Sequence, residues 1–208
     1  MAEPAFDRRL LETALAALGE EAFAAGKIID LAVYGWSSLV LTTNFRVSTR
    51  DVDAVVQADE RFLELATERV GRRLGLPDGW INDGVRTYLA PNDDAAKTLF
   101  GTYPSEARPG LRVYVPMPEY LLAMKLMAMR IDAASGGKDL ADILNLMPLV
   151  GLKRKEDIVS LAAQFYPEAR TSGKIVLAID SLWQEKLRHD RKRTDAPAWN
   201  PRRGGGGG

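Results

Sequence analysis

The order of the hydrophobic patterns along the chain constrains its fold most strongly. Apolar residues at spacings of three and four predict a helix over 6–25, and short runs rich in β-branched residues predict strands over 28–34 and 52–57. The segment 36–43 is expected to be a short helix or turn, and 61–74 a helix. Two more strands are predicted over 97–103 and 111–115. Four more helices are predicted over 119–130, 138–146, 155–165 and 173–187. Strands followed by a run of helices are typical of an α+β fold. We therefore expect a small mixed β-sheet flanked by helices, with a C-terminal helical bundle.

Three segments are expected along the 208 residues. Residues 1–116 would form an N-terminal α/β core, and residues 117–193 a helical region that completes its site. Residues 194–208 end in five glycines and are expected to be a disordered tail. Glycine and proline punctuate 75–91, which predicts mostly loop, and 104–110 is expected to be a hairpin turn.

Composition excludes several classes of site. The chain has no cysteine, which excludes disulfides, zinc-thiolate sites and cysteine nucleophiles. Its single histidine, His189, lies in a charged segment, which argues against serine–histidine–acid catalysis. No run approaches the roughly 20 apolar residues that span a bilayer, and charges interrupt the N-terminal segment where a signal peptide would be apolar. We expect a cytoplasmic protein without a membrane partner.

Two aspartates at the start of the second predicted strand are the leading candidates for chemistry. Asp51 and Asp53 alternate with Val52, so both carboxylates should project to one side of the strand while the valine enters the core. Two nearby carboxylates repel, and a hard divalent cation such as Mg²⁺ or Mn²⁺ relieves that repulsion. The alternative is a solvated acidic pair at a strand edge.

The turn after the first predicted strand is a candidate phosphate site. Gly35 would let the backbone approach a phosphate closely, and Ser37 and Ser38 offer hydroxyl and N–H groups. The same residues would also suit an ordinary serine-capped turn. Thr49 is expected to bond a phosphate or the Asp51 carboxylate, and Arg46 a phosphate or a surface acid.

A second polar cluster lies in the helical region. Lys125 interrupts an apolar helix, where a lysine must reach solvent, pair with an acid or face a cleft. Lys138, Asp139 and Asp142 follow on the next predicted helix, where positions 138 and 142 share a face. The simpler interpretation is a salt bridge between Lys138 and Asp142. The alternative is that Lys125 and one aspartate complete a site with Asp51 and Asp53.

Taken in order, the motifs G-x-S-S-L, R-x-S-T-x-D-x-D, K-x4-R and K-D-x-x-D-I resemble those of a known family. The chain is similar from about residue 28 to 146 to the nucleotidyltransferase-like toxins of type IV abortive-infection toxin–antitoxin systems, in the DNA polymerase beta superfamily. The resemblance implies a nucleotidyltransferase core that transfers a nucleoside monophosphate from a nucleoside triphosphate such as ATP to an acceptor hydroxyl. RNA, such as the 3′ end of tRNA, is the expected acceptor, and an antitoxin protein is a possible partner.

The resemblance also implies roles for individual residues. Asp51 and Asp53 would bind Mg²⁺ and, with Lys125 and Asp142, form the catalytic set. The nucleotide or its phosphates would be bound by a larger group, namely Gly35, Ser37, Ser38, Thr49, Arg46, Lys138 and Asp139.

Two departures from the family pattern support an alternative function. Trp36 stands where the family turn usually has a small residue, and the strand predicted over 111–115 carries no third carboxylate. The alternative is a catalytically inactive binding or regulatory protein that keeps the nucleotidyltransferase fold.

Overall fold

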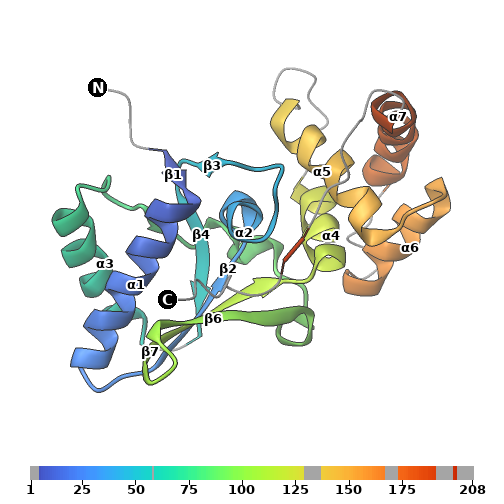
Figure 1. The fold of residues 1–208 in the computed structure, drawn as a ribbon. Helices are drawn as coiled ribbons and strands as arrows, with labels where there is room; N and C mark the ends of the chain where they lie inside the picture. The colour runs from blue at the N-terminus through green and yellow to red at the C-terminus, as the bar shows by residue number, and fades with distance from the viewer. Residues whose placement is uncertain (1–4, 58, 129–136, 167–172, 191–198, 201–208) are drawn as a thin grey trace. The chain divides into compact units, whose positions relative to one another are not determined.

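The computed structural model describes residues 5–57, 59–128, 137–166, 173–190 and 199–200 (Figure 1). The chain divides into two compact units, each described by itself below. The first comprises 1–87, 97–116 and 200–208, and the second comprises 88–96 and 117–199. No helix within the described ranges is long and apolar enough to cross a membrane. The predicted disordered tail falls largely outside these residues.

A five-stranded mixed sheet forms the centre of the first unit, in the order β5–β4–β2–β7–β6. Its strands are β2 (Ile29–Val33), β4 (Val52–Val56), β5 (Ile81–Asn82), β6 (Lys97–Ser105) and β7 (Arg108–Pro116). β2 runs antiparallel to β4 and parallel to β7, and β5 lies parallel to β4. Alternation sets the faces: Val52, Ala54 and Val56 enter the core while Asp53 is half-buried.

Helix α1 (Arg8–Ala24) packs directly on the β6–β7 hairpin (Figure 1). Asp7 caps its first turn by accepting a hydrogen bond from the N–H of Leu10 at 2.7 Å. Two glycines make the close packing possible. A Cβ on Gly110 would collide with the carbonyl oxygen of Gly19, and one on Gly19 would lie 2.5 Å from the backbone of Tyr103.

Smaller elements complete the first unit. Helix α2 (Gly35–Thr42) follows β2, and helix α3 (Glu60–Leu74) follows β4. Strands β1 (Phe6–Asp7) and β3 (Ser48–Thr49) pair antiparallel in a separate small sheet. Trp80, 2% exposed, stacks on Phe6 with ring centroids 5.8 Å apart and donates a hydrogen bond to the carbonyl of Thr67. The remaining short elements are the 3₁₀ turns η1 (Gly84–Tyr88) and η2 (Asp93–Ala96).

The second unit is helical. It contains α4 (Pro118–Ala128), α5 (Gly137–Val150), α6 (Lys155–Phe165) and α7 (Gly173–Asp190). Tyr120 is fully buried, and its ring lies 5.0 Å from that of Phe165. Its hydroxyl accepts a hydrogen bond from the N–H of Ala90, and burial raises the pKa of Tyr120.

The structure confirms the predicted α+β class, with a mixed sheet flanked by helices and a helical C-terminal part. Three short strands, β1, β3 and β5, were missed, and β5 lies in the segment predicted as loop. The predicted hairpin turn over 104–110 is shorter, because strand pairing continues to Ser105 and Arg108. Pro104 is tolerated in β6 because β6 is an edge strand.

Candidate functional site

The two candidate aspartates flank the first residue of β4. Val52 is fully buried, Asp51 is exposed and Asp53 is half-buried, which is the alternation that the sequence predicted. Val52 also donates its N–H to the carbonyl of Trp80 at 2.7 Å, which fixes the start of the strand. The backbone that carries the two carboxylates is therefore fixed at the start of the strand.

Gly35 lies directly against the Asp53 carboxylate. Its φ of +57° is in the left-handed region, and a Cβ at this position would collide with Oδ2 of Asp53. Tyr34, the residue before it, donates its N–H to the carbonyl of Asp53 at 2.8 Å. Glycine is thus needed both for the backbone conformation and for the space that the aspartate occupies.

Buried hydroxyls fix the backbone around the two aspartates. Ser37, fully buried, donates to the carbonyl of Asp51 at 2.9 Å and accepts from the N–H of Asp53 at 3.3 Å. Thr49, 3% exposed, donates to the same Asp51 carbonyl at 3.0 Å. Ser38 donates to the carbonyl of Gly35 at 2.9 Å. In this structure the three hydroxyls hold the chain around Asp51 and Asp53, and phosphate binding by these residues stays a prediction.

Asn82 is a site residue that the sequence interpretation missed. It lies beside Asp53 in the parallel β4–β5 register, and its side-chain amide donates to Oδ2 of Asp51 at 3.1 Å. A two-residue strand has too little alternation to be recognised in a segment rich in glycine and proline. The available signal was the polar pair Asn82-Asp83 directly after Trp80 and Ile81.

Arg46 and Trp36 lie against each other near the candidate turn. The guanidinium carbon of Arg46 is 4.1 Å from the centroid of the Trp36 ring, a cation–π distance. The contact of Arg46 with a phosphate stays a prediction. Trp36, which departs from the family pattern, therefore stacks with a cation from the loop after α2.

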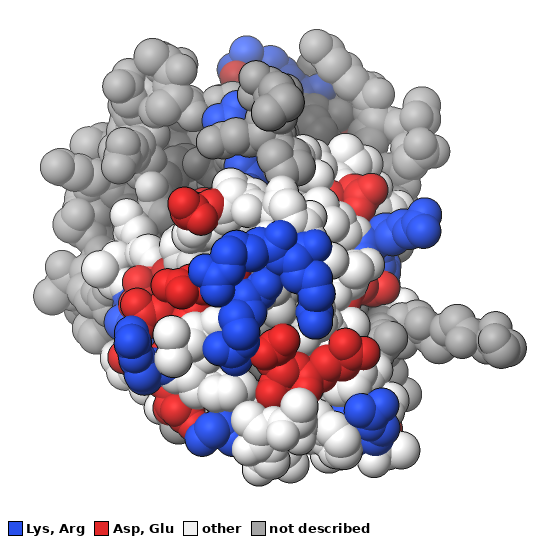
Figure 2. All heavy atoms as spheres, turned by 90° about the vertical axis from the view of Figure 1, so that its left-hand side faces the viewer, with Lys and Arg blue, Asp and Glu red and all other residues white. Residues whose placement is uncertain are grey.

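The surface formed around α3 carries charges of both signs. Figure 2 shows lysine and arginine side chains gathered beside acidic ones on this face. Arg69 and Arg73 of α3 each pair with Glu21 of α1, at 2.8 and 3.7 Å. A groove of about 1090 Å³ runs between α3 and the segment from Gly75 to Asp83, and its rim also has both charge signs. This mixed charge gives the face no strong preference for an anionic partner.

The second polar cluster is a buried ion pair. Nζ of Lys125 in α4 lies 3.1 Å from Oδ2 of Asp142 in α5, with side chains 8% and 3% exposed. Asp142 therefore pairs across two helices, in addition to any contact with Lys138 on its own helix. Lys138 and Asp139 fall in the first turn of α5, but their side chains lie outside the described part of the chain. Lys125 and Asp142 belong to the second unit and Asp51 and Asp53 to the first.

The donor set at β4 fits a magnesium-type cation. Carboxylate oxygens of Asp51 and Asp53 are the hard ligands that Mg²⁺ prefers, and Mg²⁺ is often held by one or two carboxylates with substrate phosphates completing its shell. Among the residues that the structure describes, no group of three or more His, Cys, Asp or Glu side chains is placed to hold a metal ion. A cation at this site would therefore depend on oxygens from a bound substrate or water.

Comparisons with known proteins identify the fold. No protein-family model matches the chain, and no curated protein matches it. Among solved structures, it is similar to an antigenic nucleotidyltransferase-like protein from Paracoccidioides brasiliensis, with 18% sequence identity and a TM-score of 0.52. The match covers 90% of this chain and 94% of that one. The chain therefore has the fold of a nucleotidyltransferase-like protein.

Proposed function

We propose that the protein is a Mg²⁺-dependent nucleotidyltransferase that transfers a nucleoside monophosphate from a nucleoside triphosphate to an acceptor hydroxyl. The observation that carries the proposal is the packing of the Asp53 carboxylate against the left-handed Gly35 turn, with Asp51 at the same strand end. Two acids beside the glycine that begins this turn would provide metal ligands next to the backbone of the turn. The similarity of fold to a nucleotidyltransferase-like protein supports the same reaction class.

In this reaction the acceptor oxygen bonds to the α-phosphorus while the bond from that phosphorus to the bridging oxygen breaks. The acceptor loses its proton and pyrophosphate leaves. A cation held by Asp51 and Asp53 would neutralise the charge that develops on the phosphate oxygens. The backbone at Gly35, Ser37 and Ser38 would orient the triphosphate, and the buried hydroxyls would keep both aspartates in place.

The proposal includes the roles that the family resemblance implies for the second unit. Lys125 would contact nucleotide phosphates, and Asp142 would act as base or orienting group, with Lys138 and Asp139 in support. Nζ of Lys125 lies 3.1 Å from Oδ2 of Asp142, so the two residues would act as a pair. Arg46 and Thr49 complete the proposed nucleotide-binding set.

The proposed acceptor is RNA, such as the 3′ end of tRNA, and the proposed outcome in the cell is growth arrest by a toxin that an antitoxin protein neutralises. A protein hydroxyl is the second acceptor class. Incubation with each labelled nucleoside triphosphate, Mg²⁺ and total tRNA should give labelled tRNA, and a parallel incubation with protein tests the second acceptor class. Asp51→Ala should lower the transfer by about 10²- to 10³-fold, since electrostatic groups at a reaction centre typically contribute factors of this order.

Asp78→Ala is the matched control for this assay. Asp78 is exposed and has no hydrogen bond or ion pair with any described residue. It should transfer label at the wild-type rate. Equal transfer by wild type and Asp51→Ala with every acceptor would refute the enzymatic function.

The alternative is a binding or regulatory protein without catalysis. The stacking of Trp36 on Arg46 favours it, because an aromatic ring and a cation engaged with each other next to Gly35 restrict the space for a triphosphate. Calorimetric titration with Mg²⁺ and each triphosphate distinguishes several outcomes. Binding with transfer supports the enzyme, binding without transfer supports the binding protein, and no heat with any triphosphate argues against nucleotide binding altogether.

A further inference from the structure

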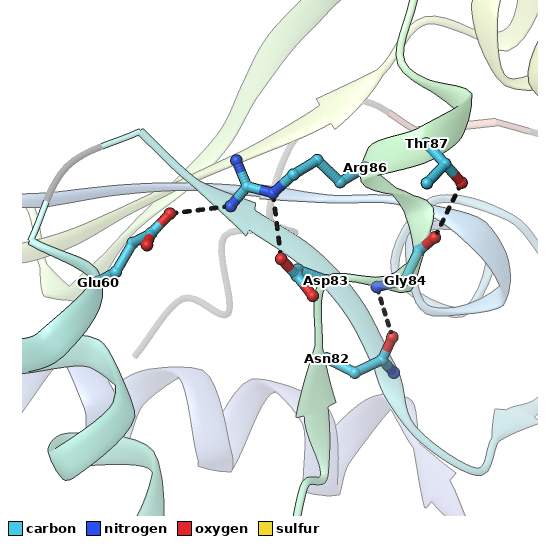
Figure 3. A network of polar contacts seen from close by, with 6 residues as sticks. All are labelled: Glu60, Asn82, Asp83, Gly84, Arg86 and Thr87. Carbon is cyan, nitrogen blue, oxygen red and sulfur yellow. Dashed lines mark hydrogen bonds and ion pairs between the residues drawn. The ribbon is translucent and has the colours of Figure 1, made fainter.

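Asn82 is held in one orientation at the end of β5. Its Oδ1 accepts a hydrogen bond from the N–H of Gly84 at 3.0 Å (Figure 3). A backbone N–H can only donate, so the atom facing it must be the amide oxygen. The amide nitrogen of Asn82 is then directed to its other contact, Oδ2 of Asp51, at 3.1 Å.

The turn that supplies the Gly84 N–H is itself anchored. Arg86 bonds the carboxylate of Asp83 and that of Glu60 at the start of α3, each at 3.0 Å (Figure 3). Its backbone N–H also donates to the carbonyl of Asp83 at 2.8 Å. Arg86 thus links η1 to the start of α3, and the N–H of Gly84 at the start of η1 contacts Asn82.

We infer that Asn82 is a positioning residue for the Asp51 carboxylate, a role that rests on the proposed function. Its N–H group contacts Oδ2 of Asp51. Oδ1 of the same carboxylate would then be the oxygen that binds a cation. A neutral donor also attracts the charged form of the carboxylate without competing for a cation, whereas an acid in its place would repel Asp51. Hydrogen-bond partners of metal-ligating carboxylates typically change metal affinity by 10- to 100-fold when removed.

The inference predicts a metal-free signature first. In ¹⁵N–¹H spectra the side-chain NH₂ resonances of Asn82, assigned by their loss in Asn82→Ala, should shift in Asp51→Ala. They should stay in place in Asp78→Ala. Unchanged Asn82 resonances in Asp51→Ala would overturn the inference whatever the protein catalyses.

The second measurement is the dissociation constant for Mn²⁺ alone, determined from the electron paramagnetic resonance signal of the free ion. Asn82→Ala should weaken Mn²⁺ binding by about 10-fold or more. Asn92→Ala should leave it unchanged, because the Asn92 side chain is exposed and makes no hydrogen bond with the described residues. Wild-type affinity in Asn82→Ala, combined with loss of binding in Asp51→Ala, would refute the positioning role and leave the proposed function standing.

Asn82→Asp keeps the side-chain shape and tests the contact if the alanine variant does not fold. Its new oxygen would face Asp51 Oδ2 in place of a donor, so the melting temperature without metal should fall, and Mn²⁺ should raise it by more than in wild type. A metal-free melting temperature equal to that of wild type would contradict the hydrogen bond.

If the wild type itself binds no Mn²⁺ and Asp51→Ala transfers label normally, the proposed function fails and the inference fails with it.

Discussion

The contact between Gly35 and Asp53 restricts both residues. The turn brings the backbone of α2 so close to the strand that the aspartate carboxylate lies where a side chain at position 35 would begin. Ser37 and Thr49 both donate a hydrogen bond to the backbone carbonyl of the neighbouring aspartate, Asp51. Each of these residues was identified from the sequence, Asp53 as a metal ligand, Gly35 and Ser37 for a phosphate turn or an ordinary capped turn, and Thr49 for a phosphate or the Asp51 carboxylate. Hydroxyl orientation depends on which backbone groups lie nearby, and that is a tertiary property.

Gly35→Ala should destabilise the fold and displace Asp53. Left-handed φ values cost a non-glycine residue about 1–2 kcal/mol, and the collision with the carboxylate adds to this cost. Gly26→Ala is the matched control, because Gly26 has a φ of +67° and open space around its Cβ position. In urea unfolding, Gly26→Ala should lower the free energy of unfolding only by the backbone cost. Gly35→Ala should lower it by more and should also bind Mn²⁺ more weakly. Equal losses in the two variants would show that the contact with Asp53 has no energetic consequence.

At the scale of elements, the described helices and the four longest strands follow from periodicity, and their bounds agree with the prediction to within a few residues. Of the three short strands that escaped prediction, β5 matters for the site, and its two residues derive their conformation from pairing with β4 and not from local pattern. Because β5 brings Asn82 to Asp51, the same omission removed one residue from the predicted site. The sequence left two partners open for Asp142, Lys138 on its own helix and Lys125, and helix packing brings Lys125 from α4 to Asp142.

The packing of α1 on the β6–β7 hairpin gives a prediction at this scale. Gly110→Ala would place a methyl group against the Gly19 carbonyl and 2.7 Å from the backbone nitrogen of Phe23, so helix and hairpin must separate. Such overpacking typically costs about 1–3 kcal/mol, which urea unfolding monitored by tryptophan fluorescence would measure. Ala107→Ser in the exposed hairpin turn should change stability by less than about 0.5 kcal/mol. Wild-type stability in Gly110→Ala would contradict the close approach of the two elements.

At the scale of the molecule, the fold class could be predicted from the sequence, but the contacts between distant elements could not. The apolar patterns predicted the α+β class because each element must bury one face, and this requirement is local to the sequence. Of the residues predicted for the site, Asp51 and Asp53 belong to one unit and Lys125 and Asp142 to the other. Periodicity assigns such residues to elements but carries no information on how distant elements meet.

A whole-molecule measurement separates a metal site from a solvated acidic pair. If Asp51 and Asp53 bind a divalent cation, Mg²⁺ at ten times its dissociation constant should stabilise the native state by about 1.4 kcal/mol. For a chain of this size that corresponds to a rise in melting temperature of about 3–6 °C. Asp53→Asn should abolish the rise, and without metal it should melt at or above the wild-type temperature, since the substitution removes a like-charge repulsion. A solvated pair predicts the same melting temperature with and without Mg²⁺ in both proteins, so the wild-type response to Mg²⁺ distinguishes the two interpretations without any substrate.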